Sequence, residues 1–113
     1  MFQVDNLRFN APTSMKKGRA VTITHATQTA VYTAAAAAGE YITVSDESNG
    51  SIAVRKLSVL TDAVYADAGG TVTMGSDLEV VGAEGKFQNK SAGVAVAKAR
   101  TTGASGSFIS LYV

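Results

Sequence analysis

The sequence predicts an all-β protein: a small β-barrel or β-sandwich of short antiparallel strands, with an extended N-terminal arm and at most one short helix. Three observations predict this class. From Arg19 onward, segments rich in Val, Ile and Thr alternate apolar with polar residues, as half-buried strands do. Each segment ends at Gly, Asn or Asp, which favour turns. The turns follow one another closely, which is typical of small barrels and sandwiches.

The first eighteen residues differ from the rest of the chain. They contain the only proline, Pro12, and their apolar residues follow neither a helical nor a strand period. We therefore interpret residues 1–18 as an extended arm and residues 19–113 as a single β-barrel domain. A chain of 113 residues has room for one hydrophobic core of ordinary size, which agrees with one domain.

The alternation predicts nine strands after the arm. The Asn49-Gly50 pair is the strongest hairpin signal, because both residues accept the positive φ angles of a type I′ turn. The last segment is apolar except for Ser107 and Ser110, so we expect it in the centre of a sheet. The predicted strands are residues 20–25, 30–33, 40–45, 51–60, 63–66, 70–74, 77–81, 93–97 and 107–113.

One segment leaves a helix and a loop as equal alternatives. Residues 33–39, TAAAAAG, contain good helix formers followed by a glycine. Five alanines form little more than one turn, and nucleation makes so short a helix marginal without packing. The segment therefore predicts either one short helix or a tight loop.

Composition excludes several classes of function. Ten Lys and Arg against nine Asp and Glu leave a net charge of +1, which argues against nucleic acid or an anionic membrane as the main partner. The absence of Cys and the single His remove thiolate zinc sites and most histidine-based metal sites. Asp5 and Arg8 interrupt any secretory signal, and the longest apolar run, residues 34–38, is far too short to span a membrane. We expect no cofactor, no metal and no small-molecule substrate.

No residue type stands in a catalytic pattern, so we expect a protein that is not an enzyme. His25 has no second His and no nearby acid, which is typical of an ordinary strand residue. Asp46 and Glu47 resemble an acid pair, but they enter the Asn49-Gly50 turn, where acidic side chains bind turn backbone.

Lys16, Lys17 and Arg19 form the only basic cluster. Such a cluster either contacts a negatively charged partner or marks a solvated junction between arm and barrel, and we favour the junction. The four tyrosines are spread over separate predicted strands, which favours core edges or interface anchors over a platform that stacks bases.

The C-terminal half carries a family resemblance in the order of its strands and glycine turns. It resembles the small capsid decoration (cement) proteins of tailed bacteriophages, in which a strand, a G-K hairpin, a G-V-A strand, a glycine loop and a final apolar strand follow one another. The matching segments are AGGTVTMGSDLEV at 68–80, EGK at 84–86, AGVAVAKA at 92–99, the loop at 103–106 and SFISLYV at 107–113. The arm has no clear counterpart in that family.

The resemblance implies a β-barrel or β-sandwich that binds the outside of an assembled capsid. It implies the major capsid protein as partner, a homotrimer on the capsid, and the virion's outer surface as location. Spaced apolar residues in the arm could lie along a capsid sheet edge. The expected contact residues are Phe2, Val4, Leu7, Phe9, Lys16 and Lys17. Two alternatives remain open: another virion subunit, such as a head-tail joining or tail protein, and a small-molecule-binding β-barrel.

Overall fold

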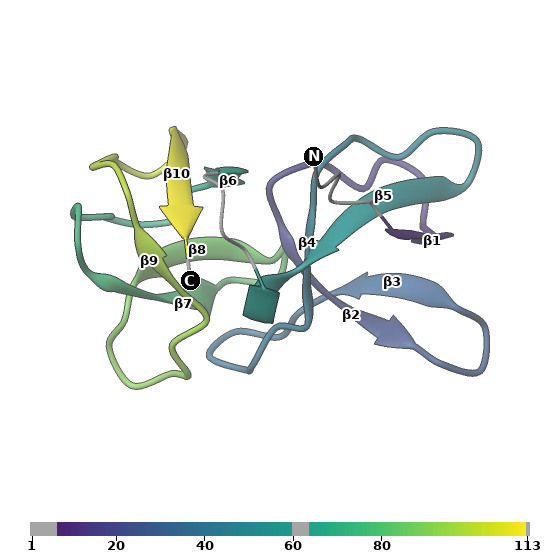
Figure 1. Ribbon diagram of the computed structural model, residues 1–113, viewed down its shortest axis with the longest axis horizontal. Helices are drawn as coiled ribbons and strands as arrows, with labels where there is room; N and C mark the ends of the chain where they lie inside the picture. The colour runs from purple at the N-terminus through teal and green to yellow at the C-terminus, as the bar shows by residue number, and fades with distance from the viewer. Residues whose placement is uncertain (1–6, 60–63, 113) are drawn as a thin grey trace.

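A computed structural model describes residues 7–59 and 64–112 of the chain. Within these residues the secondary structure is strand and turn with one 3-10 helix, which confirms the predicted all-β class. Figure 1 shows two five-stranded sheets side by side. The elements are β1 Leu7–Asn10, β2 Ala20–Thr24, β3 Thr29–Tyr32, β4 Tyr41–Thr43, β5 Ser51–Lys56, η1 Leu57–Val59, β6 Val64–Asp67, β7 Asp77–Val81, β8 Lys86–Asn89, β9 Ala97–Ala99 and β10 Phe108–Tyr112.

The first sheet is a closed barrel with the order β1-β3-β2-β4-β5. Strand β1 closes it, because it pairs antiparallel with β5 and meets β3 in parallel at Asn10 and Thr29. Alternate residues point inward, as the period of a strand requires. The interior is filled by Met15, Val21, Ile23, Ala30, Ile52 and Val54, with Phe9, Ala11, Tyr32 and Tyr41 packed against them.

The second sheet has the order β6-β10-β9-β7-β8, so the C-terminal strand β10 lies inside the sheet as its apolar sequence predicts. The sheet curls, so that its two edge strands, β6 and β8, come close together. Ala68, which follows β6, forms a parallel bridge with Phe87 of β8. Of the residues that the structure describes, Phe87 has the largest fully buried side chain. The core around it also includes Ala20, Ile42 and Leu57 of the first half, so apolar packing continues between the sheets.

The expected arm is wrong from Leu7 onward, because β1 is part of the barrel. Its four residues pair with β5 from Leu7–Val54 to Asn10–Ser51. Met15, expected in the same arm, is 3% exposed and packs inside the barrel. The irregular apolar pattern of this segment does not indicate either the pairing of β1 with β5 or the burial of Met15, because both depend on residues far away in the sequence. Residues 1–6 lie outside the described residues.

Several strands differ from the prediction at their ends, and other segments differ in kind. The strand expected at 51–60 ends at Lys56, and residues 57–59 form the 3-10 helix η1. Residues 70–74 are not a strand: Val72 alone is buried, and it forms an isolated bridge with Gly103. The strand expected at 93–97 is shifted to Ala97–Ala99. Strand β8 was not predicted, because in KFQN only Phe87 is apolar, although it is buried.

Backbone geometry decides two predictions, the Asn49-Gly50 turn and the choice between helix and loop at residues 33–39. Asn49 and Gly50 have φ angles of 53° and 77°, and Ser48 and Ser51 exchange backbone hydrogen bonds around them, which confirms the hairpin turn. Residues 33–39 form the loop rather than the helix. Ala36 has a φ of 64°, its N–H donates to the carbonyl of Val80, and its carbonyl accepts from Val94, so the loop is tied to the second sheet. In the part of the chain described, no helix is long and apolar enough to cross a membrane.

Candidate partner-binding surface

The expected contact residues do not form one continuous arm. Phe2 and Val4 lie outside the described residues. Leu7 is 45% exposed on β1. Phe9 on the same strand is half-buried, and its ring centroid lies 5.4 Å from that of Tyr41. Phe9 therefore contributes to the barrel, whereas Leu7 remains available at its surface.

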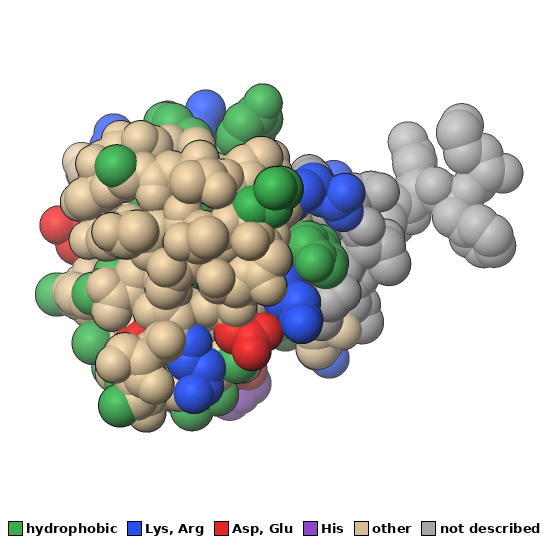
Figure 2. All heavy atoms as spheres, turned by 90° about the vertical axis from the view of Figure 1, so that its left-hand side faces the viewer, with side chains coloured by type: hydrophobic (Ala, Val, Ile, Leu, Met, Phe, Trp, Pro, Cys, Tyr) green, Lys and Arg blue, Asp and Glu red, His purple; other side chains and the backbone are tan. Residues whose placement is uncertain are grey.

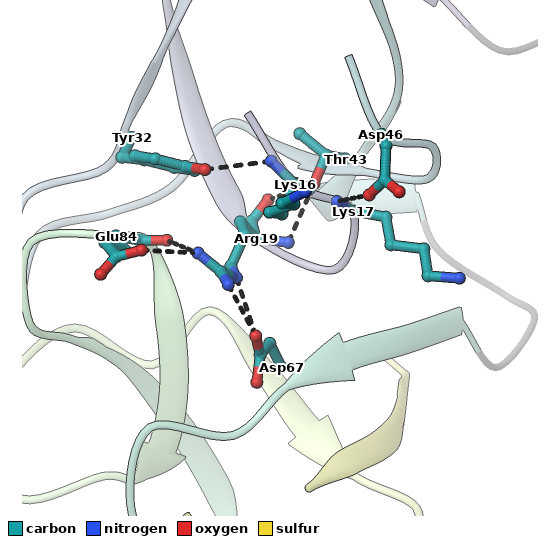
Figure 3. Close-up of polar contacts among 8 residues, drawn as sticks. All are labelled: Lys16, Lys17, Arg19, Tyr32, Thr43, Asp46, Asp67 and Glu84. Atoms are coloured by element: carbon teal, nitrogen blue, oxygen red, sulfur yellow. Dashed lines mark hydrogen bonds and ion pairs between the residues drawn. The ribbon is translucent and has the colours of Figure 1, made fainter. Parts of the chain in front are cut away.

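Arg19 joins the two sheets. Its position beside two lysines favours a solvated junction between arm and barrel, but the structure shows a buried residue. Its residue exposure is 7%. Its Nη2 lies 2.8 Å from Oδ2 of Asp67, to which Nε also donates, at 3.0 Å. Its Nη1 donates to the carbonyl and the carboxylate of Glu84 at 3.2 and 3.3 Å. Figure 3 shows the guanidinium between these two acids, which belong to the second half of the chain.

The backbone next to Arg19 is held from both sides. The N–H of Gly18 donates to the carbonyl of Thr43, and the carbonyl of Gly18 accepts from Asp67, each at 2.8 Å. The N–H of Ala20 donates to the carbonyl of Gly85 at 2.7 Å. Because these bonds reach strands β4 and β6 and the β7–β8 turn, residues 18–20 form a fixed connection between the sheets.

The two lysines differ from Arg19 in that their hydrogen bonds are made by the backbone. The N–H of Lys16 donates to the hydroxyl of Tyr32 at 3.1 Å, and that of Lys17 donates to Asp46 at 3.0 Å. The buried hydroxyl of Thr43 donates to the carbonyl of Lys16 at 2.8 Å. In Figure 3 the side chain of Lys17 extends away from this cluster. A fixed backbone thus carries an exposed ammonium group.

That ammonium group lies beside two exposed aromatic residues. Tyr65 on β6 is 71% exposed and Phe108 on β10 is 55% exposed. Phe108 pairs with Asp67 and Ser110 pairs with Tyr65, so the two rings are diagonal neighbours on the outward face. The Nζ of Lys17 lies 5.8 Å from the centre of the Phe108 ring, within the range of a cation–π contact.

The same residues line a depression between the sheets, which we call the inter-sheet groove. One part of it, about 250 Å³, combines barrel residues with the start of β6. A second part, about 200 Å³, lies between Lys17, Tyr65 and Phe108. The groove is lined by Lys17, Thr43, Val44, Arg55, Val64, Tyr65 and Phe108. A surface that combines exposed aromatic rings with a cation resembles the anchor region of protein interfaces.

The sequence did not single out this surface. The sequence predicts Tyr65 only as one of four tyrosines at core edges or interface anchors, and it predicts Phe108 only as part of an apolar segment in the centre of a sheet. The available signal was the period of two: Ala66, Ile109 and Leu111 are buried, which turns Tyr65 and Phe108 outward. Knowing that β6 and β10 are neighbours is needed to bring the two rings together.

The end of the molecule formed by the second sheet is chemically different. Figure 2 shows this face as mostly backbone and uncharged polar side chains, with charged side chains chiefly at its margins. Among the described residues there is no group of three or more His, Asp or Glu that could hold a metal ion. His25 lies exposed in the turn after β2, and its carbonyl accepts a bond from the Gln28 amide.

Two carboxylates stabilise turns by accepting backbone hydrogen bonds. Glu47 accepts from the N–H groups of Gly50 at 2.7 Å and Ser14 at 3.1 Å, and these bonds hold its carboxyl pKa below the usual value. Glu79 accepts from the N–H groups of Ser91 and Gly93. The bond from Ser91 is the largest cause of a lowered pKa for Glu79. Both acids therefore act as turn ligands, as the position of Glu47 predicted.

Comparisons with known proteins find a similar fold but no similar sequence family. No family model matches the chain, and no curated protein matches it. Among solved structures the fold is similar to the crystal structure of the head fiber gp8.5 N base of bacteriophage phi29. The TM-score is 0.72 at 16% identity, and the match covers 96% of this chain and 92% of that one. At this identity the likeness concerns the fold, and it extends over both sheets.

Proposed function

We propose that the chain is a non-enzymatic structural protein of a bacteriophage virion, which binds the outer capsid surface and stabilises contacts between neighbouring major capsid protein subunits. The fold likeness to the N base of a phage head fiber carries this proposal, because it covers nearly all of both chains. The resemblance of residues 68–113 to phage decoration proteins supports the same role independently. We include in the proposal a homotrimer on the capsid, in which each weak contact is repeated.

The construction of the molecule fits a part that provides contact area. Two curled sheets are connected through a buried Arg19 that bonds to Asp67 and Glu84, so the surface they share is held in one arrangement. A rigid surface loses little conformational entropy on binding. Exposed Leu7 and the two lysines remain the described members of the expected contact set, whereas Phe9 serves mainly the barrel.

The alternatives fit less well. A small-molecule-binding barrel needs an open interior, but this barrel is filled by Val21, Ile23, Ile52 and Val54 together with Met15. A head-tail joining or tail subunit would share the virion context, but the similar structure is described as part of a head fiber. We therefore favour attachment to the head.

Light scattering and co-sedimentation with empty capsids test the proposal. The capsids are those of the phage whose genome encodes the chain, purified without this protein. We expect saturable binding at a fixed number of copies per capsid and an increase in the temperature at which capsids disassemble. A monomer that stays in the supernatant at all capsid concentrations would overturn the proposal. Removing residues 1–6 leaves β1 intact, so this truncation tests the Phe2 and Val4 contacts separately.

A further inference from the structure

The inter-sheet groove has the features of a peptide-binding site. Tyr65 and Phe108 are 71% and 55% exposed, although aromatic rings bury more apolar surface than most side chains when they find a partner. They stand on paired strands of one sheet, and the barrel supplies the opposite wall through Thr43 and Val44. Two large rings and a concave wall together offer an apolar anchor position.

The described lining of the groove carries a positive charge at Lys17. Among the described residues it contains no acidic side chain. Two acids that adjoin lining residues are already engaged: Asp67, which pairs with Phe108, bonds to Arg19, and Asp46 accepts the N–H of Lys17. A partner that enters the groove therefore gains from carrying a carboxylate next to an apolar side chain.

Lys17 is held by contacts at its backbone and at its ammonium group. Its N–H is bonded to Asp46, the neighbouring Gly18 is bonded to Thr43 and Asp67, and its ammonium group lies over the Phe108 ring. This support reduces the freedom that Lys17 must lose when it pairs with an incoming carboxylate.

We infer that the inter-sheet groove receives an acidic segment of the capsid protein, with an apolar side chain between Tyr65 and Phe108 and a carboxylate against Lys17. The inference rests on the proposed function and names its contact surface. Aromatic residues near the centre of an interface commonly carry most of the binding energy, surrounded by contacts of smaller effect. Within the proposed contact with the capsid, the groove is therefore the anchor.

The test measures the affinity of purified variants for empty capsids by co-sedimentation. Tyr65→Ala and Phe108→Ala each raise the Kd about tenfold or more. Met74→Ala and Val94→Ala are the matched controls, since these side chains are also exposed, at 67% and 47%, but lie in loops outside the groove. Lys17→Gln weakens binding and reduces its dependence on salt, whereas Lys90→Gln, an equal change of charge elsewhere, does not.

The outcomes separate this inference from the proposed function. If the wild-type protein does not bind capsids, both fail. If it binds and the groove variants bind as tightly as the controls, only the inference fails. Sedimentation velocity distinguishes a capsid segment from a second copy of the chain as the occupant of the groove. If the wild type is a trimer and Tyr65→Ala is a monomer, a second copy occupies the groove. That result also overturns the inference. Melting temperatures close to that of the wild type establish that the variants are folded.

Discussion

Arg19 and Asp67 form the ion pair that joins the two sheets, with Nη2 and Oδ2 2.8 Å apart and side-chain exposures of 8% and 15%. Arg19 directly precedes β2 of the barrel, and Asp67 ends β6 of the second sheet. A pair this far removed from water depends on each partner to compensate the other's lost hydration. Glu84 also contacts Arg19, but its side chain is 62% exposed and contributes less.

Replacing Asp67 by Ala should therefore destabilise the protein much more than replacing Glu84 by Ala. Asp67→Ala leaves the Arg19 guanidinium buried with only a partly solvated partner, at a cost of about 3 kcal/mol in unfolding free energy. Glu84→Ala should cost less than about 1 kcal/mol. Urea denaturation measures both, with Asp77→Ala as the control, because Asp77 pairs with Lys98 where both are half exposed. Equal losses for Asp67 and Glu84 would contradict this assignment.

Gly85 and Gly82 provide a matched pair for the contact between the sheets. Both have left-handed φ angles, 69° and 73°, so alanine is strained by about 1–2 kcal/mol at either position. A Cβ on Gly85 would overlap the carbonyl oxygen of Ala20, whereas one on Gly82 meets no atom within 4 Å. We expect Gly85→Ala to lose about 1–3 kcal/mol more than Gly82→Ala in urea denaturation. Similar losses would mean that the β7–β8 turn moves freely against the barrel.

Truncation of two phenylalanines on the second sheet should lower the stability of the protein by very different amounts. Phe87 is fully buried, so Phe87→Ala should cost about 3–5 kcal/mol through the cavity it leaves. Phe108 is 55% exposed, so Phe108→Ala should lower the unfolding free energy only slightly. Calorimetric melting temperatures check both. A large loss for Phe108→Ala would show that this ring supports the fold and is not kept for a partner.

The sequence predicts local features of this fold better than its long-range ones. The strand at residues 77–81 and the Asn49-Gly50 turn are confirmed because alternation and positive φ angles are local properties. The insertion of β1 next to β5 could not be read in the same way, since pairing across more than forty residues leaves no local pattern. The groove could not be predicted for the same reason, because its lining residues come from five separated segments of the chain.

Acidification should destabilise the protein in part through Glu47. Hydrogen bonds from the N–H groups of Gly50 and Ser14 lower its carboxyl pKa in the folded protein below the usual value of a glutamate. A group whose pKa is lowered on folding adds stability above its unfolded pKa, and this contribution is lost as the pH falls through the folded value. Glu79, whose pKa is also lowered, acts in the same direction. Urea midpoints measured from pH 7 to pH 3 should therefore fall, and Glu47→Gln should fall less steeply than the wild type because its amide does not titrate. Parallel curves for the two proteins would show that the Glu47 carboxylate is not preferentially bound by the turn.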